Sequence, residues 1–154
     1  MTKKYLDDFE VGQVIEFGPR TITRDEILEF ARAYDPQSFH IDEAAARKSI
    51  YGGLIASGWH TMSILMRMIV DGLLNDVVNL GSPGMDELRW LKPVRPGDTL
   101  TARATIAEIR PSRSKPDRGI VKTFYEVFNQ NGERVMTVRG IGMFARRPED
   151  RVAE

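Results

Sequence analysis

YDPQSFH at residues 34–40 and IASGWH at residues 55–60 are the stretches that decide how this chain folds, and they contain both of its histidines. Asp35 precedes a proline, which disfavours the helical conformation of the residue before it and has no N–H to continue a helix. A helix is therefore expected to end at Asp35. The helix dipole opposes an anion at that end by a few tenths to about 1 kcal/mol, so helix energetics do not explain the aspartate.

His40 follows five positions after Asp35, just before Asp42, which resembles the N-cap of a short helix over residues 43–47. A carboxylate and an imidazole thus flank one compact loop. Such a pair can hold and polarise a water molecule, because one group can take a proton while the other delivers one. The alternatives are that Asp35 is a turn residue before proline and that His40 is a structural, hydrogen-bonded histidine.

Gly58 lies in the first turn of a second, long apolar helix that Ser57 and Trp59 help to open. The first N–H groups of a helix have no partner within it and carry the positive end of the dipole, so they can bind a developing oxyanion. A glycine lets a ligand approach that backbone closely. The alternative is that Gly58 merely begins the helix where Ser57 fails as a cap.

Asp35, His40 and Gly58, with the segments FHID at 39–42 and GLIASG at 53–58, resemble the MaoC-like dehydratases, the family of (R)-specific enoyl-CoA hydratases. The family motif reads Asp-x-Asn-Pro-x-His, with a glycine eighteen residues beyond the histidine, and both spacings match (35 to 40, 40 to 58). LRWLKPVRPGDTL at 88–100 resembles a second recurring family segment.

One segment and one further position depart from the family pattern. The chain has Pro-Gln-Ser at 36–38 where the family usually has a residue followed by Asn-Pro, and it has Ser57 where a histidine often precedes the glycine. These departures leave the catalytic pair intact and bear on the class of substrate.

This resemblance implies an α+β hotdog fold, in which an antiparallel β-sheet wraps around a long central helix. It implies that Asp35, His40 and Gly58 are catalytic and that the substrate is a coenzyme A thioester, with no further cofactor and no metal. It also implies a homodimer or a higher homo-oligomer.

The composition agrees with a single domain over residues 1–154, because this length can bury a substantial core. Lys plus Arg and Asp plus Glu number 22 each, which gives no bulk electrostatic case for nucleic acid or an anionic membrane. Without cysteine there can be no disulfide, thiol nucleophile or thiolate metal site. The N-terminus lacks an apolar signal region and no segment suits a membrane span, so a cytoplasmic location is expected.

The remaining elements follow from periodicity and turn signals. Thr23 and Glu26 form a predicted capping box for the helix that ends at Asp35. The central helix is expected over 58–74. Alternating segments separated by turns, one of them the Asn-Gly pair at 131–132, predict an antiparallel sheet. Its expected strands are 14–22, 85–92, 98–110, 119–129 and 133–146.

The central helix carries an apolar stripe at helical spacing: Met62, Leu65, Met66, Ile69, Val70 and Leu73, widened by Met68 and Leu74. The methionines can form an acyl-chain tunnel of adaptable shape or simply fill the core. His60 lies around the helix from Gly58, where it is expected to be a helix-end or interface residue, with substrate contact as the alternative.

Basic residues are the candidates for the coenzyme A phosphates, because arginine and lysine make charge-assisted bonds to phosphate oxygens. Arg113 and Lys115 lie in a proline-interrupted loop at 110–118, whose alternative role is a solvated surface loop. Arg89 and Lys92 are equally eligible. Ser57 and Trp59, which flank the glycine, are further substrate-binding candidates.

The predicted function is reversible hydration of a trans-2-enoyl-CoA to an (R)-3-hydroxyacyl-CoA by a lyase. The first alternative is a hotdog acyl-CoA thioesterase, in which a carboxylate directs water at the thioester carbonyl. The second is a non-catalytic acyl-CoA-binding module.

Overall fold

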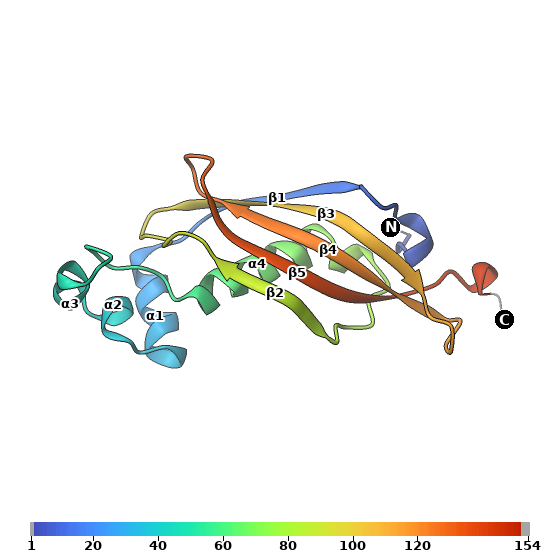
Figure 1. The fold of residues 1–154 in the computed structure, drawn as a ribbon, viewed down its shortest axis with the longest axis horizontal. Coiled ribbons are helices and arrows are strands. Elements are labelled where there is room, and N and C mark those ends of the chain that lie inside the picture. The colour runs from blue at the N-terminus through green and yellow to red at the C-terminus, as the bar shows by residue number, and fades with distance from the viewer. Residues whose placement is uncertain (1, 152–154) are drawn as a thin grey trace.

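A computed structural model of the chain describes residues 2–151 and shows one five-stranded antiparallel sheet curved around a long helix (Figure 1). The strand order is β1-β3-β4-β5-β2. This arrangement confirms the predicted sheet around a central helix. The strands are β1 Val14–Thr21, β2 Gly84–Trp90, β3 Thr99–Pro111, β4 Arg118–Phe128 and β5 Arg134–Ala145.

Alternation of side chains along the strands places the core between the sheet and the helix. On β4, Val121 and Thr123 are buried, whereas Ile120 and Lys122 lie on the outer face. The predicted strands agree with the observed ones to within two residues. The largest difference is at β2, which ends at Trp90 because the next two N–H groups both donate to the carbonyl of Val135.

Helix α4, Gly58–Gly72, is the central helix, and Leu65 on it is fully buried. The Ser57 hydroxyl accepts from the Trp59 N–H, so Ser57 does cap this helix and the alternative that it fails to do so is wrong. The helix ends earlier than the expected residue 74, because Leu73 leaves the helical conformation and Leu74–Asp76 form a 3₁₀ turn.

Three shorter helices, α1 Arg24–Tyr34, α2 Ser38–Ile41 and α3 Glu43–Lys48, gather beyond one end of the sheet, beside the start of α4 (Figure 1). Helix α1 ends before Asp35 as predicted, and Asp42 caps α3. Helix α2 lies where a compact loop is expected from the sequence: residues 38–41 form one short helical turn. No helix within residues 2–151 has the length and hydrophobicity to cross a membrane.

The capping box predicted at the start of α1 forms only in part. Thr23 accepts a hydrogen bond from the Glu26 N–H. The Glu26 side chain turns towards Arg20, at 4.0 Å, and its Oε2 has no hydrogen-bond partner within residues 2–151. The competing ion pair explains why the reciprocal bond is absent.

Candidate functional site

Asp35 and His40 face each other at the start of α4, with 3.3 Å between Asp35 Oδ2 and His40 Nε2. Asp35 is the residue that ends α1, and His40 is carried by α2, which the break at Pro36 allows to form. Both side chains are largely buried, with exposed fractions of 17% and 6%. The two residues that the motif predicts to act together are therefore neighbours in space.

The ring of His40 is fixed by a backbone carbonyl. Its Nδ1 lies 2.8 Å from the carbonyl oxygen of Ile55. A carbonyl can only accept, so Nδ1 carries a proton and Nε2 is the nitrogen that can gain or lose one. The Ile55 N–H in turn donates to the carbonyl of Phe39. The segment before α4 thus sets both the tautomer and the orientation of the imidazole.

Asp35 accepts hydrogen bonds at both carboxylate oxygens. Gln37 Nε2 donates to Oδ1 and the Ser57 hydroxyl donates to Oδ2, each at 2.7 Å. Burial raises the pKa of Asp35, but these two bonds and the charge on His40 outweigh it, so the pKa lies below its ordinary value. The carboxylate is therefore an anion at neutral pH.

Ser57 is fully buried, and its hydroxyl is committed to Asp35 while it also caps α4. This geometry indicates that Ser57 positions the carboxylate. The contact between Ser57 and substrate that the sequence predicts is not tested by these bonds and stays a prediction.

Gly58 begins α4, and its N–H donates no hydrogen bond within residues 2–151. A free N–H at this position can bind a developing negative charge, as the sequence predicted. The space beside its Cα is already filled, however. A Cβ at Gly58 would lie 2.2 Å from Cε2 of Trp90, so the close neighbour that requires a glycine here is an indole ring.

Trp59 lies over the same region, with 57% of its surface exposed, and its ring meets that of Trp90 edge to face at 5.3 Å. Arg89 and Lys92, two candidates for binding the coenzyme A phosphates, flank Trp90 in the sequence, but each already forms an ion pair. Arg89 forms an ion pair with Glu87, and Lys92 forms one with Glu133.

Arg113 and Lys115 lie on the β3–β4 hairpin, at the opposite end of the sheet from α1 to α3 (Figure 1). One chain therefore does not bring them together with Asp35 and His40. The hairpin forms a separate pocket with Arg110 and Arg118. The assignment of these residues to coenzyme A stays a prediction.

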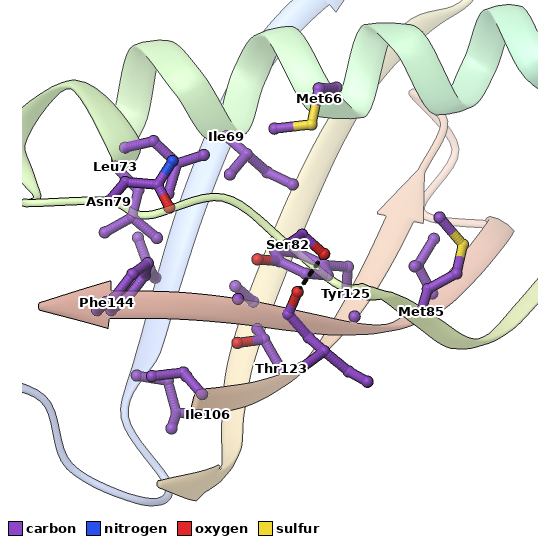
Figure 2. A pocket seen from close by; sticks show the side chains of 18 of the residues that line it. Met66, Ile69, Leu73, Asn79, Ser82, Met85, Ile106, Thr123, Tyr125 and Phe144 are labelled. Atoms are coloured by element: carbon purple, nitrogen blue, oxygen red, sulfur yellow. Dashed lines mark hydrogen bonds between the residues drawn. The ribbon is translucent and has the colours of Figure 1, made fainter. Parts of the chain in front are cut away.

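An apolar cavity of about 300 Å³ lies between α4 and the inner face of the sheet (Figure 2). Its wall on α4 begins at Met62, one helical turn beyond Gly58, and continues through Met66 and Ile69 to Leu73, which follows the helix. The apolar residues predicted for α4 thus serve two roles: Leu65 packs in the core, whereas Met62 and Met66 line the cavity.

Two hydroxyl-bearing residues of β4, Thr123 and Tyr125, line the opposite wall of this cavity (Figure 2). Burial raises the pKa of Tyr125, and a hydrogen bond with Thr123 partly offsets this effect. The tyrosine therefore stays neutral at physiological pH, and the cavity carries no charge on this side.

His60 is buried, and its ring stacks on that of Phe30 with 4.6 Å between centroids. Burial lowers the pKa of His60, Arg20 lowers it further, and Glu26 opposes them. The stack joins α1 to α4, which agrees with the predicted interface role.

Sequence comparison places residues 8–126 in one family, described as the MaoC like domain. The chain belongs to the MaoC-like family. The matched segment includes Asp35, His40, Gly58 and the strand that carries Trp90. Within residues 2–151 there is no cluster of three His, Cys, Asp or Glu residues that could hold a metal ion.

Relatives of this MaoC-like domain cover most of its length. A crystal structure of a MaoC-like dehydratase from Rhodospirillum rubrum is 41% identical, with a TM-score of 0.84, and the match covers 94% of this chain and 99% of that one. YdeM of Bacillus subtilis is 33% identical over 131 residues, which are 84% of this chain and 91% of YdeM. An (R)-specific enoyl-CoA hydratase of R. rubrum is 28% identical over 116 residues, covering 71% of this chain and 74% of the relative.

Three parts of the site in this MaoC-like domain escaped sequence analysis. The Ile55 carbonyl leaves no side-chain signal. The bond from Gln37 to Asp35 could have been suspected from the motif, because an amide side chain stands two residues after the aspartate. Trp90 reaches Gly58 only through the fold.

Replacing Ser57 by alanine should raise the pKa of Asp35 towards its ordinary value, because one of the hydrogen bonds that stabilise its charged form is lost. The measurement is an NMR titration of the Asp35 carboxyl carbon in wild type and Ser57→Ala. Ser63→Ala is the matched control, since the Ser63 hydroxyl donates to the Trp59 carbonyl on the same helix and should leave Asp35 unchanged. An unchanged Asp35 titration in Ser57→Ala would contradict the assigned role.

Proposed function

We propose that this MaoC-like domain adds water reversibly to a trans-2-enoyl-CoA and forms an (R)-3-hydroxyacyl-CoA. The observation that carries the proposal is the Asp35–His40 pair, 3.3 Å apart, beside the free N–H at the start of α4. The (R)-specific enoyl-CoA hydratase relative supports the substrate class and the stereochemistry.

In this reaction one water molecule bridges Asp35 and His40. When His40 is neutral, its Nε2 and the Asp35 carboxylate both accept hydrogen bonds, so a water can donate one O–H to each and direct a lone pair at substrate. The water oxygen bonds to the β-carbon and its proton passes to the pair. A proton from the pair goes to the α-carbon on the same face. Asp35 and His40 are in contact, so the roles of acid and base are assigned to the pair rather than to either residue.

Negative charge accumulates on the thioester oxygen as the β-carbon is attacked. The Gly58 N–H stabilises this enolate-like oxygen, and the loss of one such donor can cost about 3 kcal/mol. No metal or redox cofactor takes part in the proposed reaction. The acyl chain lies in the cavity lined by Met62 and Met66, because that cavity starts one turn beyond Gly58 and is largely apolar.

The coenzyme A end of the substrate is proposed to contact Trp59, with Arg89 and Lys92 near the same strand end. Arg113 and Lys115 remain candidates for its phosphates. We also propose that the protein is located in the cytoplasm.

We expect Asp35→Asn and His40→Ala each to lower the rate of crotonyl-CoA hydration by at least about a hundredfold, because each removes half of the acid–base pair. The assay follows loss of the enoyl-thioester absorbance, with chiral analysis of the product. Asp71→Asn is the control, since Asp71 is an exposed α4 carboxylate paired with Arg67.

Two results would replace the hydratase by another function. Release of free thiol from a saturated acyl-CoA, lost in Asp35→Asn, would indicate a thioesterase. Tight binding of enoyl-CoAs of short, medium and branched chains without turnover would indicate an acyl-CoA-binding module.

Gly142→Val should make the protein discriminate against long acyl chains. Gly142 lines the cavity from β5, and a Cβ there meets only ordinary contacts, so the first carbon of the valine side chain fits and its methyl groups would take up cavity space. Each methylene that can no longer be buried costs about 0.8 kcal/mol. The kcat/KM ratio of octenoyl-CoA to crotonyl-CoA should fall at least about tenfold. Ile120→Leu, on the outer face of β4, is the control; an unchanged ratio in Gly142→Val would place the acyl chain elsewhere.

The active form is proposed to be a homodimer or a higher homo-oligomer. Strand β2 lies at the edge of the described sheet, which leaves its outer backbone groups open to another strand. Met85, Trp90 and Leu91 are each more than 40% exposed at this edge. Sedimentation velocity at micromolar concentration should give at least twice the chain mass of 17.5 kDa; a monomer would contradict this part of the proposal.

A further inference from the structure

The indole of Trp90 covers the first residue of α4. A Cβ built on Gly58 would lie 2.2 Å from Cε2, 2.5 Å from Nε1 and 2.7 Å from Cδ2 of Trp90, so the face of the ring lies over Gly58, with Nε1 among its nearest atoms. In a helix the Cα–Cβ direction tilts towards the N-terminus, which is also the direction of the free N–H groups. The indole nitrogen therefore lies on the side of Gly58 where its N–H is available.

Two hydrogen-bond donors lie close together here, and neither is used by the described part of the chain. Within residues 2–151 neither the Gly58 N–H nor the Trp90 Nε1–H donates a hydrogen bond. The N and Cβ positions of one residue are about 2.5 Å apart, so Trp90 Nε1 lies within about 5 Å of the Gly58 nitrogen. One oxygen atom can accept from two nitrogens at that separation, since each N–H···O distance is about 2.9 Å.

The ring of Trp90 is supported on two sides. Its backbone belongs to β2, opposite Met136 of β5, and its ring meets Trp59 edge to face, with 80° between the planes. An indole N–H is a donor only, so it can serve an oxyanion but cannot replace the water-holding groups. Because no group of residues 2–151 accepts from either donor, the acceptor must come from outside the chain.

We propose that Trp90 is a further catalytic residue, whose Nε1–H is the second donor, beside the Gly58 N–H, to the thioester oxygen of the substrate. This inference rests on the proposed hydratase function. The donor holds the oxygen as negative charge develops on it and transfers no proton. It also gives the glycine a reason: any side chain at 58 would push the indole, and its N–H, away from the oxygen.

Trp90→Phe tests the proposal, because it keeps an aromatic ring and removes the N–H. We expect kcat for crotonyl-CoA to fall by about a hundredfold with KM changed less than about threefold, as for loss of one oxyanion donor. Tyr34→Phe is the matched control, since Tyr34 is an exposed aromatic residue that also loses its hydrogen-bond donor, and it should stay within about threefold of wild type. Equal losses in both variants would overturn the proposal and make the loss a general effect of changing an aromatic residue near the site.

A second readout uses no turnover. Acetoacetyl-CoA forms an enolate with its own absorbance band, so the enolised fraction of bound ligand at fixed pH reports stabilisation of the thioester oxyanion. This fraction should fall at least about tenfold in Trp90→Phe and remain unchanged in Tyr34→Phe. A wild-type fraction in Trp90→Phe would overturn the proposal.

The outcomes separate this inference from the proposed function. Hydration by wild type together with unaltered kinetics in Trp90→Phe would overturn the role of Trp90 and leave the hydratase standing. An inactive wild type whose bound enolate still depends on Trp90 would overturn the hydratase and retain the donor pair. If Trp90→Phe does not fold, benzothienylalanine at position 90, which has sulfur in place of the N–H in a ring of the same shape, gives the same comparison.

Discussion

The hydrogen bond from Ser57 to Asp35 is the contact on which the site depends. It joins the end of α1 to the start of α4 at 2.7 Å, and the donor, Ser57, is fully buried. Ser57 also accepts from the Trp59 N–H, so the residue that begins the central helix is the one that holds the carboxylate. Loss of the cap costs about 1 kcal/mol, and loss of a bond to a buried carboxylate adds to that. Helix stability and carboxylate position are therefore coupled.

The main elements of the fold were predictable because each rests on local physics. The strands alternate and are separated by turn residues, and α4 repeats apolar residues at helical spacing. Local signals failed where elements are short or where charges compete. Helix α2 is four residues long and has no side-chain cap, so no pattern marks it. Glu26 has the correct spacing for a capping box, but Arg20 from β1 attracts its carboxylate.

The residues of the site also fall into those that local sequence predicts and those that it does not. Asp35, His40 and Gly58 could be predicted because a proline, a loop and a helix start fix their spacing within one stretch of sequence. The position of Arg113 could not, because it depends on topology. Strand β3 is 13 residues long and carries the following hairpin about 40 Å from the end where α1 lies. Trp90 is likewise brought to Gly58 only by the pairing of β2 with β5 at the sheet edge.

The methionines of the cavity have a consequence for chemistry under oxidative stress. The chain has seven methionines and no cysteine, so thioethers are the sulfur groups that it offers to an oxidant. Met66 is 40% exposed and also lines the cavity, which places a reactive sulfur at the boundary between solvent and the apolar interior. Conversion to the sulfoxide would put a strong dipole in that wall, and methionine sulfoxide reductases can reverse it. The same atom that lets the wall adapt its shape thus makes it sensitive to peroxide.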